Sequence, residues 1–349
     1  MYEKEKGYSK KEYFSCMILV TGGTGLVGAH LLYHLLLEHP KVRATHRKNS
    51  DVASVKKVFS YYTEEVEALF QKIEWVEANI TELPALTEAF KNITHVYHCA
   101  AFISFNPKHY YALKKANIEG TANVVNLCIA NSVKKLCYVS SIATLGKTLE
   151  GQPISEENDW NPEDNNSVYS ITKYGAEMEV WRGTQEGLDA VIVNPGVILG
   201  EGYWNSGSGV LIKRVAKGVH FYTHGSTGFV DVKDVVKAMI TLMNSHVKNE
   251  KFILVAANAT YKEFLTKLSK EFGNKPPSKY ISKRILMILS NLDWLSNNLF
   301  KTKRSLLKAT VHSLYTHSKY DASKIEKVLS FQFTPFEETF RRIIKYYPN

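Results

Sequence analysis

Short apolar runs alternate with longer amphipathic stretches along most of the chain. Residues 17–20 form a short apolar run that is long enough for a buried strand, and residues 42–46 and 95–98 follow as further short strands. Strands that alternate with helices form a parallel sheet covered on both faces, so the pattern predicts an α/β fold with a Rossmann-type, doubly wound parallel sheet. The same reading predicts further strands at 73–78, 135–139 and 190–193, and helices at 26–38, 117–130 and 168–186.

The alternation loosens after about residue 200. Residues 229–243 return to a strand and a helix, whereas the chain from residue 260 onward is mainly helical and is broken by Pro276 and Pro277. We therefore expect a large domain and a smaller, mainly helical carboxyl-terminal lobe that binds substrate. The large domain comprises 17–200, with 229–257 returning to it, and the lobe comprises 201–228 and 258–349.

The first sixteen residues differ from the rest of the chain. Residues 1–16 hold four lysines and three glutamates, without the apolar stretch of a secretory signal. We expect a disordered leader there and a cytoplasmic protein.

A glycine-rich turn joins the first predicted strand to the first predicted helix. It reads TGGTGLVG over residues 21–28. Glycines permit a tight turn and a close backbone approach to phosphate, and the N-terminus of the helix offers N–H groups to a pyrophosphate. In this position between strand and helix the turn predicts a dinucleotide site, with contacts from Gly22, Thr24, Gly25, Leu26, Val27 and Gly28.

The end of the second predicted strand bears on the choice of dinucleotide. An NAD site places an acid there to bind the ribose 2′-hydroxyl, but no acid occurs before Asp51. Arg47 and Lys48 can instead neutralise a 2′-phosphate, unless they are simply a solvated basic loop. The sequence thus favours NADP(H), with NAD(H) as the alternative.

Two groups of residues supply candidate proton chemistry. Ser140 and Ser141 follow the strand predicted at 135–139, where a hydroxyl can bind a substrate oxygen, although turn formation is the alternative role. Tyr169 and Lys173 are four residues apart and share one helical face. An ammonium beside a phenol favours the phenolate, so the pair can exchange a proton with an alcohol or carbonyl.

The order of glycine turn, strand-end serines and Y-x-x-x-K resembles the extended short-chain dehydrogenases/reductases of the NAD-dependent epimerase/dehydratase superfamily. The resemblance is strongest to the branch of dihydroflavonol reductases, cinnamoyl-CoA reductases and 3β-hydroxysteroid dehydrogenases. It runs from Met17 to about Met243. It is also carried by HCAA at 98–101, NIEGT at 117–121, NPG at 194–196 and FVDV at 229–232.

This resemblance implies a role for each matching residue. Ser141 would be the catalytic serine, Tyr169 the acid/base, and Lys173 the residue that lowers the pKa of that tyrosine and holds the nicotinamide ribose. Asn117 would lie near the cofactor and the lysine. Asn79 stands where the family usually has an aspartate near adenine. Further contacts to the cofactor would come from Ile80, Ala100, Ala101, Ser140, Asn194, Pro195, Gly196 and Val197.

The resulting hypothesis is an NADP-dependent oxidoreductase that reduces an aldehyde or ketone to an alcohol, or runs the reverse reaction. One alternative is an NAD-dependent nucleotide-sugar epimerase or dehydratase. Another is a non-catalytic regulator that senses the dinucleotide, although a sensor has no need of Ser141, Tyr169 and Lys173. The small-molecule substrate is less well defined, and loop aromatics favour an apolar or planar one, with ordinary packing as the alternative. The candidates are Phe102, Phe105, Tyr203, Trp204 and Phe221.

Charge is concentrated near the carboxyl end. Of the formal net charge of +10, most lies in residues 276–349, which hold thirteen Lys or Arg and five Asp or Glu. This segment is either a solvated basic face or a surface that meets an anionic substrate, such as a CoA thioester, or an acidic partner. The basic residues follow no nucleic-acid-binding motif.

Residues 281–300 are the one candidate for membrane contact. Charged and polar residues interrupt the segment, so it cannot span a bilayer, and we expect an amphipathic helix packed on the core rather than one lying on a membrane. Neither the four scattered cysteines nor the twelve histidines show the spacing of a metal site. The resemblance also suggests a homodimer through two long helices.

Overall fold

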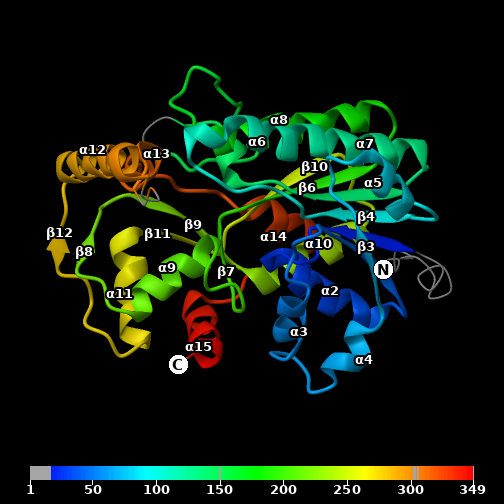
Figure 1. The fold of residues 1–349 in the computed structure, drawn as a ribbon, viewed down its shortest axis with the longest axis horizontal. Helices are drawn as coiled ribbons and strands as arrows, with labels where there is room; N and C mark the ends of the chain where they lie inside the picture. The colour runs from blue at the N-terminus through cyan, green and yellow to red at the C-terminus, as the bar shows by residue number, and fades with distance from the viewer. Residues whose placement is uncertain (1–16, 149–150, 302–303, 305, 349) are drawn as a thin grey trace.

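Seven parallel strands form the central sheet (Figure 1), in the order β10-β6-β5-β4-β1-β2-β3. The computed structural model describes residues 17–148, 151–301, 304 and 306–348, so the expected leader at 1–16 lies outside the described residues. The strands are β1 (Ile18–Thr21), β2 (Val42–His46), β3 (Ile73–Glu77), β4 (His95–His98), β5 (Lys135–Val139), β6 (Ala190–Pro195) and β10 (Glu250–Leu254).

Helices cover both faces of this sheet, which confirms the predicted Rossmann-type fold. Leu19 and Val20 are neighbours in β1 and are both fully buried, yet they belong to separate apolar clusters on opposite faces. One face carries α2 (Leu26–Glu38), α3 (Ala53–Phe59), α4 (Val66–Phe70) and α10 (Val232–Asn244), and the other carries α5 (Leu83–Ala89), α7 (Gly120–Ala130) and α8 (Val168–Gln185).

A smaller lobe lies beyond the carboxyl ends of the strands (Figure 1). Its core is aromatic, with Phe229 stacked on Phe264 at a ring separation of 4.6 Å and Phe336 and Phe340 beside them. The lobe has a sheet of its own, formed by β7 (Val197–Leu199), β9 (Ser226–Asp231) and β11 (Ala257–Thr260), and a short pair formed by β8 (Phe221–Tyr222) and β12 (Lys279–Tyr280). Its helices include α9 (Gly207–Ala216), α11 (Tyr261–Glu271), α13 (Lys308–Ser313) and α15 (Phe336–Tyr346), whereas α14 (Ser323–Leu329) packs against β10 of the central sheet.

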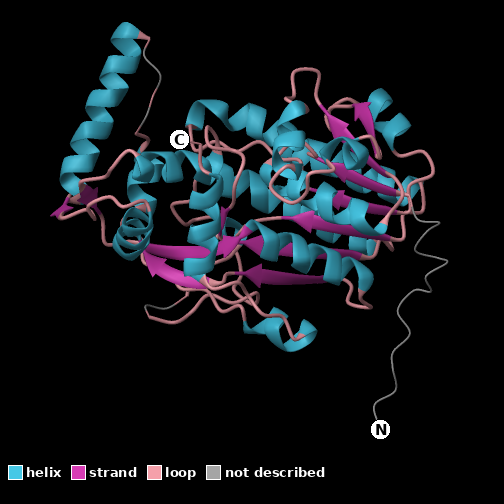
Figure 2. Cartoon of the chain, turned by 90° about the horizontal axis from the view of Figure 1, so that it is seen from below, coloured by secondary structure: helices cyan, strands magenta, loops and turns pink. Residues whose placement is uncertain are grey.

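Helix α12 (Lys283–Phe300) projects from the body of the protein (Figure 2). Its N-cap is Ser282, whose side chain accepts from the Ile285 N–H. It packs against α13, and Ser290 is its one buried residue. The expectation that residues 281–300 pack on the core was therefore wrong, because the apolar side of the helix faces outward. Within the described residues, no helix is long and apolar enough to cross a membrane.

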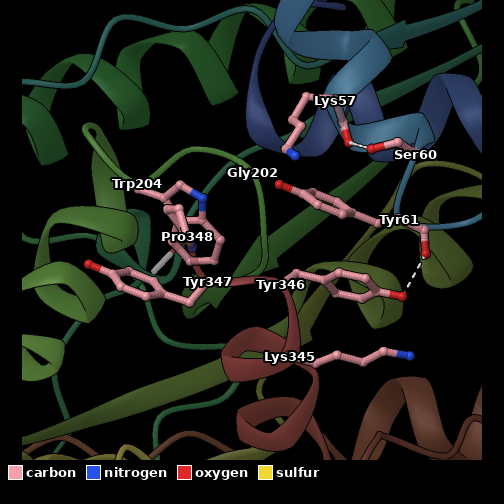
Figure 3. A pocket seen from close by; sticks show the side chains of 9 residues that line it. All are labelled: Lys57, Ser60, Tyr61, Gly202, Trp204, Lys345, Tyr346, Tyr347 and Pro348. Carbon is pink, nitrogen blue, oxygen red and sulfur yellow. Dashed lines mark hydrogen bonds between the residues drawn. The ribbon is translucent and has the colours of Figure 1, made fainter.

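A cavity of about 430 Å³ opens between α3, the loop after β7 and the end of α15 (Figure 3). The rings of Tyr61 and Tyr346, which both line it, lie 4.6 Å apart at an angle of 39°, and the Tyr346 hydroxyl donates to the Tyr61 carbonyl. Residues near the end of the chain thus pack directly on the large domain.

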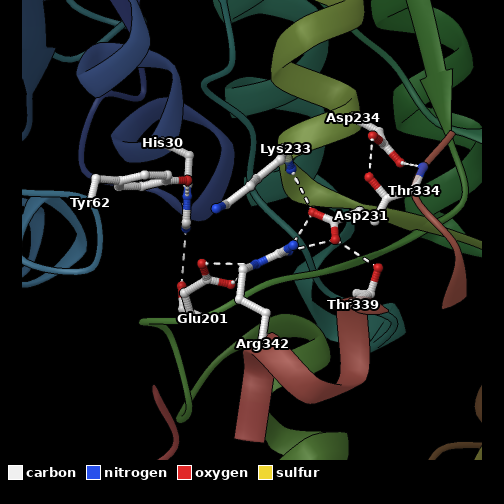
Figure 4. Close-up of polar contacts among 9 residues, drawn as sticks. All are labelled: His30, Tyr62, Glu201, Asp231, Lys233, Asp234, Thr334, Thr339 and Arg342. Atoms are coloured by element: carbon white, nitrogen blue, oxygen red, sulfur yellow. Dashed lines mark hydrogen bonds and ion pairs between the residues drawn. The ribbon is translucent and has the colours of Figure 1, made fainter. Parts of the chain in front are cut away.

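A buried cluster of charges lies where α15 and the segment after β7 meet the start of α10, a helix that packs on the central sheet (Figure 4). Arg342 of α15 pairs with Glu201, which follows β7, and with Asp231 at the end of β9. Both carboxylate side chains are fully shielded from solvent. Although burial opposes the charge, the two carboxylates raise the pKa of Arg342, which keeps it ionised. Thr339, one turn earlier in α15, donates to Asp231 at 2.7 Å.

The same cluster extends to α2. His30 Nε2 lies 3.1 Å from the Glu201 backbone carbonyl, which can only accept, so this nitrogen carries the proton. His30 Nδ1 then accepts from the Tyr62 hydroxyl at 2.5 Å. Burial lowers the pKa of His30, which favours this neutral form. The lobe is thereby connected to the helix that follows the glycine turn.

We predict that Arg342→Met lowers the free energy of unfolding by about 3–5 kcal/mol, because it leaves two carboxylates buried without their cation. Denaturant unfolding of the purified protein measures this change. The control is Lys267→Met, which breaks the solvent-exposed ion pair with Glu337 and should cost less than about 1 kcal/mol. Equal losses in the two variants would contradict the prediction.

Candidate active site

The glycine turn has the geometry of a phosphate cradle. Gly22 has a φ of +71°, and a Cβ on Gly28 would lie only 2.2 Å from the Gly22 carbonyl oxygen. Glycine is therefore required at both positions. Gly25, the N-cap of α2, provides no side-chain cap, which leaves the first N–H groups of the helix free for an anion. Gly22, Thr24, Leu26 and Val27 are half-buried, Gly25 is exposed and Gly28 is buried.

A buried histidine connects β1, the strand that leads into this turn, with β4 and α7. His98 at the end of β4 contacts Thr21 at the end of β1, with 2.6 Å between Nδ1 and Oγ1. Its other nitrogen lies 3.0 Å from Thr121 Oγ1 on α7. Burial, and to a smaller extent the charge of Lys173, lower the pKa of His98 to about 3, so the ring is neutral at physiological pH. The NIEGT and HCAA motifs meet at this contact.

Other predicted cofactor residues line the same end of the sheet. Asn79 Oδ1 accepts from the Thr81 N–H at 3.3 Å, so this side chain caps a turn. Ile80 packs against Gly120, where a Cβ would come within 2.6 Å of its Cδ1 atom. Ala100 is half-buried and Ala101 exposed at the end of β4. Asn194 and Pro195 end β6, and Gly196 and Val197 follow them half-buried.

The basic residues after β2 are free to meet a ligand. Arg47 and Lys48 are both exposed, and neither forms an ion pair with a described residue. Arg43, by contrast, is bound to Glu74 and to the carbonyls of Ala89 and Lys91, so it has a structural role. The loop therefore offers two available cations at the position where the sequence predicts a 2′-phosphate.

Ser141, Tyr169 and Lys173 come together from β5 and α8. Ser141 Oγ accepts from the Ala143 N–H at 3.1 Å as the N-cap of a short 3₁₀ helix. This contact uses a lone pair and leaves the hydroxyl proton available. Lys173 is buried and donates to the Tyr138 hydroxyl at 2.6 Å and to the Val139 carbonyl at 2.8 Å.

Burial controls the proton affinity of these groups. It raises the pKa of Tyr169 to about 12, and a hydrogen bond with the Ser141 side chain offsets part of that rise. It lowers the pKa of Lys173 to about 7, while the Glu177 carboxylate partly restores the charged form. The sequence had predicted a lowered pKa for Tyr169. The opposite direction arises because desolvation of the phenolate outweighs the stabilising contacts.

Sequence reasoning missed Glu177, the central acceptor of a buried polar cluster. Its Oε2 atom accepts from Ser140 Oγ at 2.5 Å, Thr144 Oγ1 at 2.7 Å and Asn194 Nδ2 at 3.0 Å. The hydroxyl of Ser140 is therefore occupied within the protein. The spacing could have revealed the residue, because Tyr169, Lys173 and Glu177 recur every four residues along α8.

Asn117 lies in a π-helical turn at Lys114–Glu119. Its side chain accepts from the Phe102 N–H at 2.7 Å and donates to the Phe102 carbonyl and to Thr172 Oγ1. These contacts fasten the loop after β4 to α8. Asn117 thus positions the loop, and within the described residues its side chain bonds to Phe102 and Thr172 rather than to Lys173.

The predicted pocket aromatics separate into two groups. Phe105 lies beside Tyr169 at a ring separation of 5.4 Å, and Phe102 is held by Asn117. The others are elsewhere: Tyr203 contacts Ser54, Trp204 packs on Tyr347 in the cavity of Figure 3, and Phe221 is exposed on β8. Ser141, Tyr169 and Lys173 are not part of that cavity. In the described part of the chain, no group of histidine, cysteine or acidic residues could hold a metal.

Comparisons with known proteins match the chain over most of its length. The sequence profile described as the NAD dependent epimerase/dehydratase family matches residues 18–256. Tetraketide alpha-pyrone reductase 2 of Arabidopsis thaliana is 28% identical, over 74% of this chain and 83% of its own. A 3beta-hydroxysteroid-dehydrogenase/decarboxylase isoform 1 of the same plant is 25% identical, over 93% and 78%. The dTDP-glucose 4,6-dehydratase of Streptomyces venezuelae, solved with NAD, shares 16% identity and a TM-score of 0.74 over 95% of this chain and 96% of its own.

We predict that the protein loses stability as the pH falls from about 6.5 toward 4. His98, with a pKa of about 3, and His95, with a pKa of about 4, stay neutral when folded but take up protons when unfolded. Each such histidine contributes a slope of at most about 1.4 kcal/mol per pH unit. Unfolding free energies measured across this range test the prediction.

His98→Gln should reduce the slope of the unfolding free energy against pH by up to the contribution of one proton, about 1.4 kcal/mol per pH unit. Replacement of the exposed His246 by Gln is the control for loss of a histidine at the surface. A profile in which both variants retain the parent slope would show that His98 does not contribute to the pH dependence.

Proposed function

Because the chain belongs to the NAD dependent epimerase/dehydratase family, we propose that it is an NADP-dependent reductase of a carbonyl group. Family membership confirms the resemblance carried by the motifs, and it makes the chain an enzyme that uses a nicotinamide dinucleotide. One observation carries the finer proposal: Tyr169, with Ser141 as its hydrogen-bond partner, lies at the same edge of the sheet as the glycine turn. A proton donor and a dinucleotide cradle thus share one site.

The residues of the chain fit such a cofactor. The cradle at Gly22–Gly28 can form its tight turn only because glycine occupies both of its close backbone contacts. Asn194 Oδ1, at the end of β6, is buried and has no hydrogen-bond partner in the described part of the chain. When bound, the dinucleotide supplies a hydride at this edge of the sheet.

Proton transfer is the task of the chain's own side chains. Ser141, whose lone pair caps the 3₁₀ helix, turns its hydroxyl proton to the substrate oxygen. Tyr169 holds a proton at neutral pH, because its pKa is about 12, and gives it to that oxygen as the alcohol forms. The Lys173 ammonium, one helical turn away, stabilises the tyrosinate that remains. A protonated tyrosine favours reduction as the working direction.

The substrate we infer is an aldehyde or ketone with an apolar or planar body. Phe105 lies beside Tyr169 with the two rings tilted by 60°, and it is 42% exposed, so it offers an aromatic surface at the site. The names of two relatives, a pyrone reductase and a hydroxysteroid dehydrogenase, are consistent with planar or alicyclic carbonyl compounds.

The second candidate function is that of a nucleotide-sugar epimerase or dehydratase, as in the Streptomyces protein of the same fold. Such enzymes return the hydride to their substrate and retain NAD. Arg47, which is exposed and pairs with no acid in the described part of the chain, and the absence of an acid between β2 and Asp51 favour the reductase. The complete set of Ser141, Tyr169 and Lys173 likewise favours an enzyme over a dinucleotide sensor.

We predict that Tyr169→Phe lowers kcat by a factor of about 100 to 10,000, the usual contribution of a general acid. NADPH oxidation, followed by absorbance with a panel of aryl aldehydes, cyclic ketones and thioesters, identifies a substrate and then measures the loss. Cofactor affinity should change little, because the variant keeps the ring. Parallel loss of NADPH binding and turnover would contradict the acid/base role.

We predict that Arg47→Ser lowers kcat/KM for NADPH about 10- to 100-fold, since a charged hydrogen bond contributes about 1.5–3 kcal/mol. The value for NADH should stay within about twofold, because NADH lacks the 2′-phosphate. The matched control is Lys91→Ser, which removes an exposed cation elsewhere. An equal loss of kcat/KM with both cofactors would show that Arg47 does not bind the 2′-phosphate.

A further inference from the structure

One side of α12 is apolar and faces away from the protein. Five aliphatic residues recur at intervals of three and four and so share that side, which we call the α12 stripe: Ile285, Ile288, Leu292, Leu295 and Leu299. Their exposed fractions run from 46% for Leu295 to 65% for Leu299. The opposite side is the one that packs, where Ser290 is buried and donates to the Leu306 carbonyl at 2.9 Å. The stripe thus has no partner within the described residues.

Exposed aromatic rings extend this apolar surface. On α12 itself, Trp294 and Phe300 are 48% and 74% exposed. Phe221 and Tyr280, on the β8–β12 pair that leads into the helix, are 54% and 48% exposed. Aromatic side chains at the edge of an apolar surface are typical of contact with lipid headgroups.

Cations surround the α12 stripe. Five described residues near it are exposed and form no ion pair with a described acid: Lys279, Lys283, Arg284, Lys301 and Lys308. Asp293, the single acid of the helix, is paired with Arg304 at 3.3 Å. The surface therefore combines exposed aliphatic area with uncompensated positive charge.

We propose that α12 docks on the surface of an anionic lipid membrane, parallel to its plane, with the α12 stripe at the boundary between headgroups and acyl chains. The apolar side gains free energy by leaving water, and the flanking cations gain it from the acidic headgroups. A second copy of the chain fits less well. Paired stripes would bring Lys283 and Arg284 close to the same residues or to Lys301 of the other copy, and like charges repel.

Vesicle co-sedimentation of the full chain tests this proposal. We expect binding to phosphatidylcholine vesicles that contain phosphatidylserine, weak binding to phosphatidylcholine alone, and release at high salt. Equal binding to both kinds of vesicle, or no binding to either, would overturn the proposal.

Two double variants separate the contributions of apolar area and of positive charge to vesicle binding. Leu292→Ser with Leu299→Ser should weaken binding about 100-fold, since each removes exposed aliphatic area that lipid would bury. Lys283→Gln with Arg284→Gln should weaken it roughly 30-fold. The matched controls are Leu37→Ser with Leu83→Ser, and Lys91→Gln with Lys147→Gln, which change exposed residues away from α12 and should bind as the parent does.

Sedimentation velocity completes the test, because it distinguishes lipid docking from self-association. A parent protein that ignores vesicles but forms a dimer, which the Leu292→Ser and Leu299→Ser variant abolishes, would show that the α12 stripe joins two copies. Equal loss of vesicle binding in the control variants would also overturn the proposal. Unfolding free energies of all variants establish that each is folded.

Discussion

The arrangement of the two parts of this protein depends on one buried guanidinium. Arg342, seven residues from the end of the chain, is held between Glu201 and Asp231, whose carboxylates are shielded from water. Because His30 binds the Glu201 carbonyl, the same cluster reaches the helix that begins at the glycine turn. The lobe that covers the strand ends and the helix that would receive a pyrophosphate are therefore positioned by the same group of contacts.

A second polar cluster lies around the residues to which the proposed function assigns proton transfer. Glu177 ties the segment after β5 to the end of β6, and it also lies close enough to Lys173 to favour its charged form. Tyr169 on the same helix stays protonated because its surroundings are poor in water. The cluster thus keeps an acid, a hydroxyl and an ammonium in fixed relation at the carboxyl edge of the sheet, which is where α/β folds bind ligands.

The sequence predicts the parts of this structure that local patterns determine. The strands at 42–46 and 95–98 agree to the residue, although VRATH and HVYH are only partly apolar, because both fall at regular places in the alternation of strands and helices. The partners of Arg342 are 111 and 141 residues away, and no local pattern connects them. The prediction that α12 packs on the core was wrong for a related reason. Amphipathic spacing identifies the apolar side of a helix but not what covers that side. The domain division and the catalytic roles stay predictions.

Native mass spectrometry of the freshly purified protein is the most direct test of the proposed chemistry. It identifies any dinucleotide that the protein retains and follows the filling of an empty site. A reductase that reads the 2′-phosphate through Arg47 should carry NADP(H), or should take up NADPH in preference to NADH. A stoichiometric, tightly held NAD would contradict it and would indicate an enzyme that returns the hydride to a nucleotide sugar.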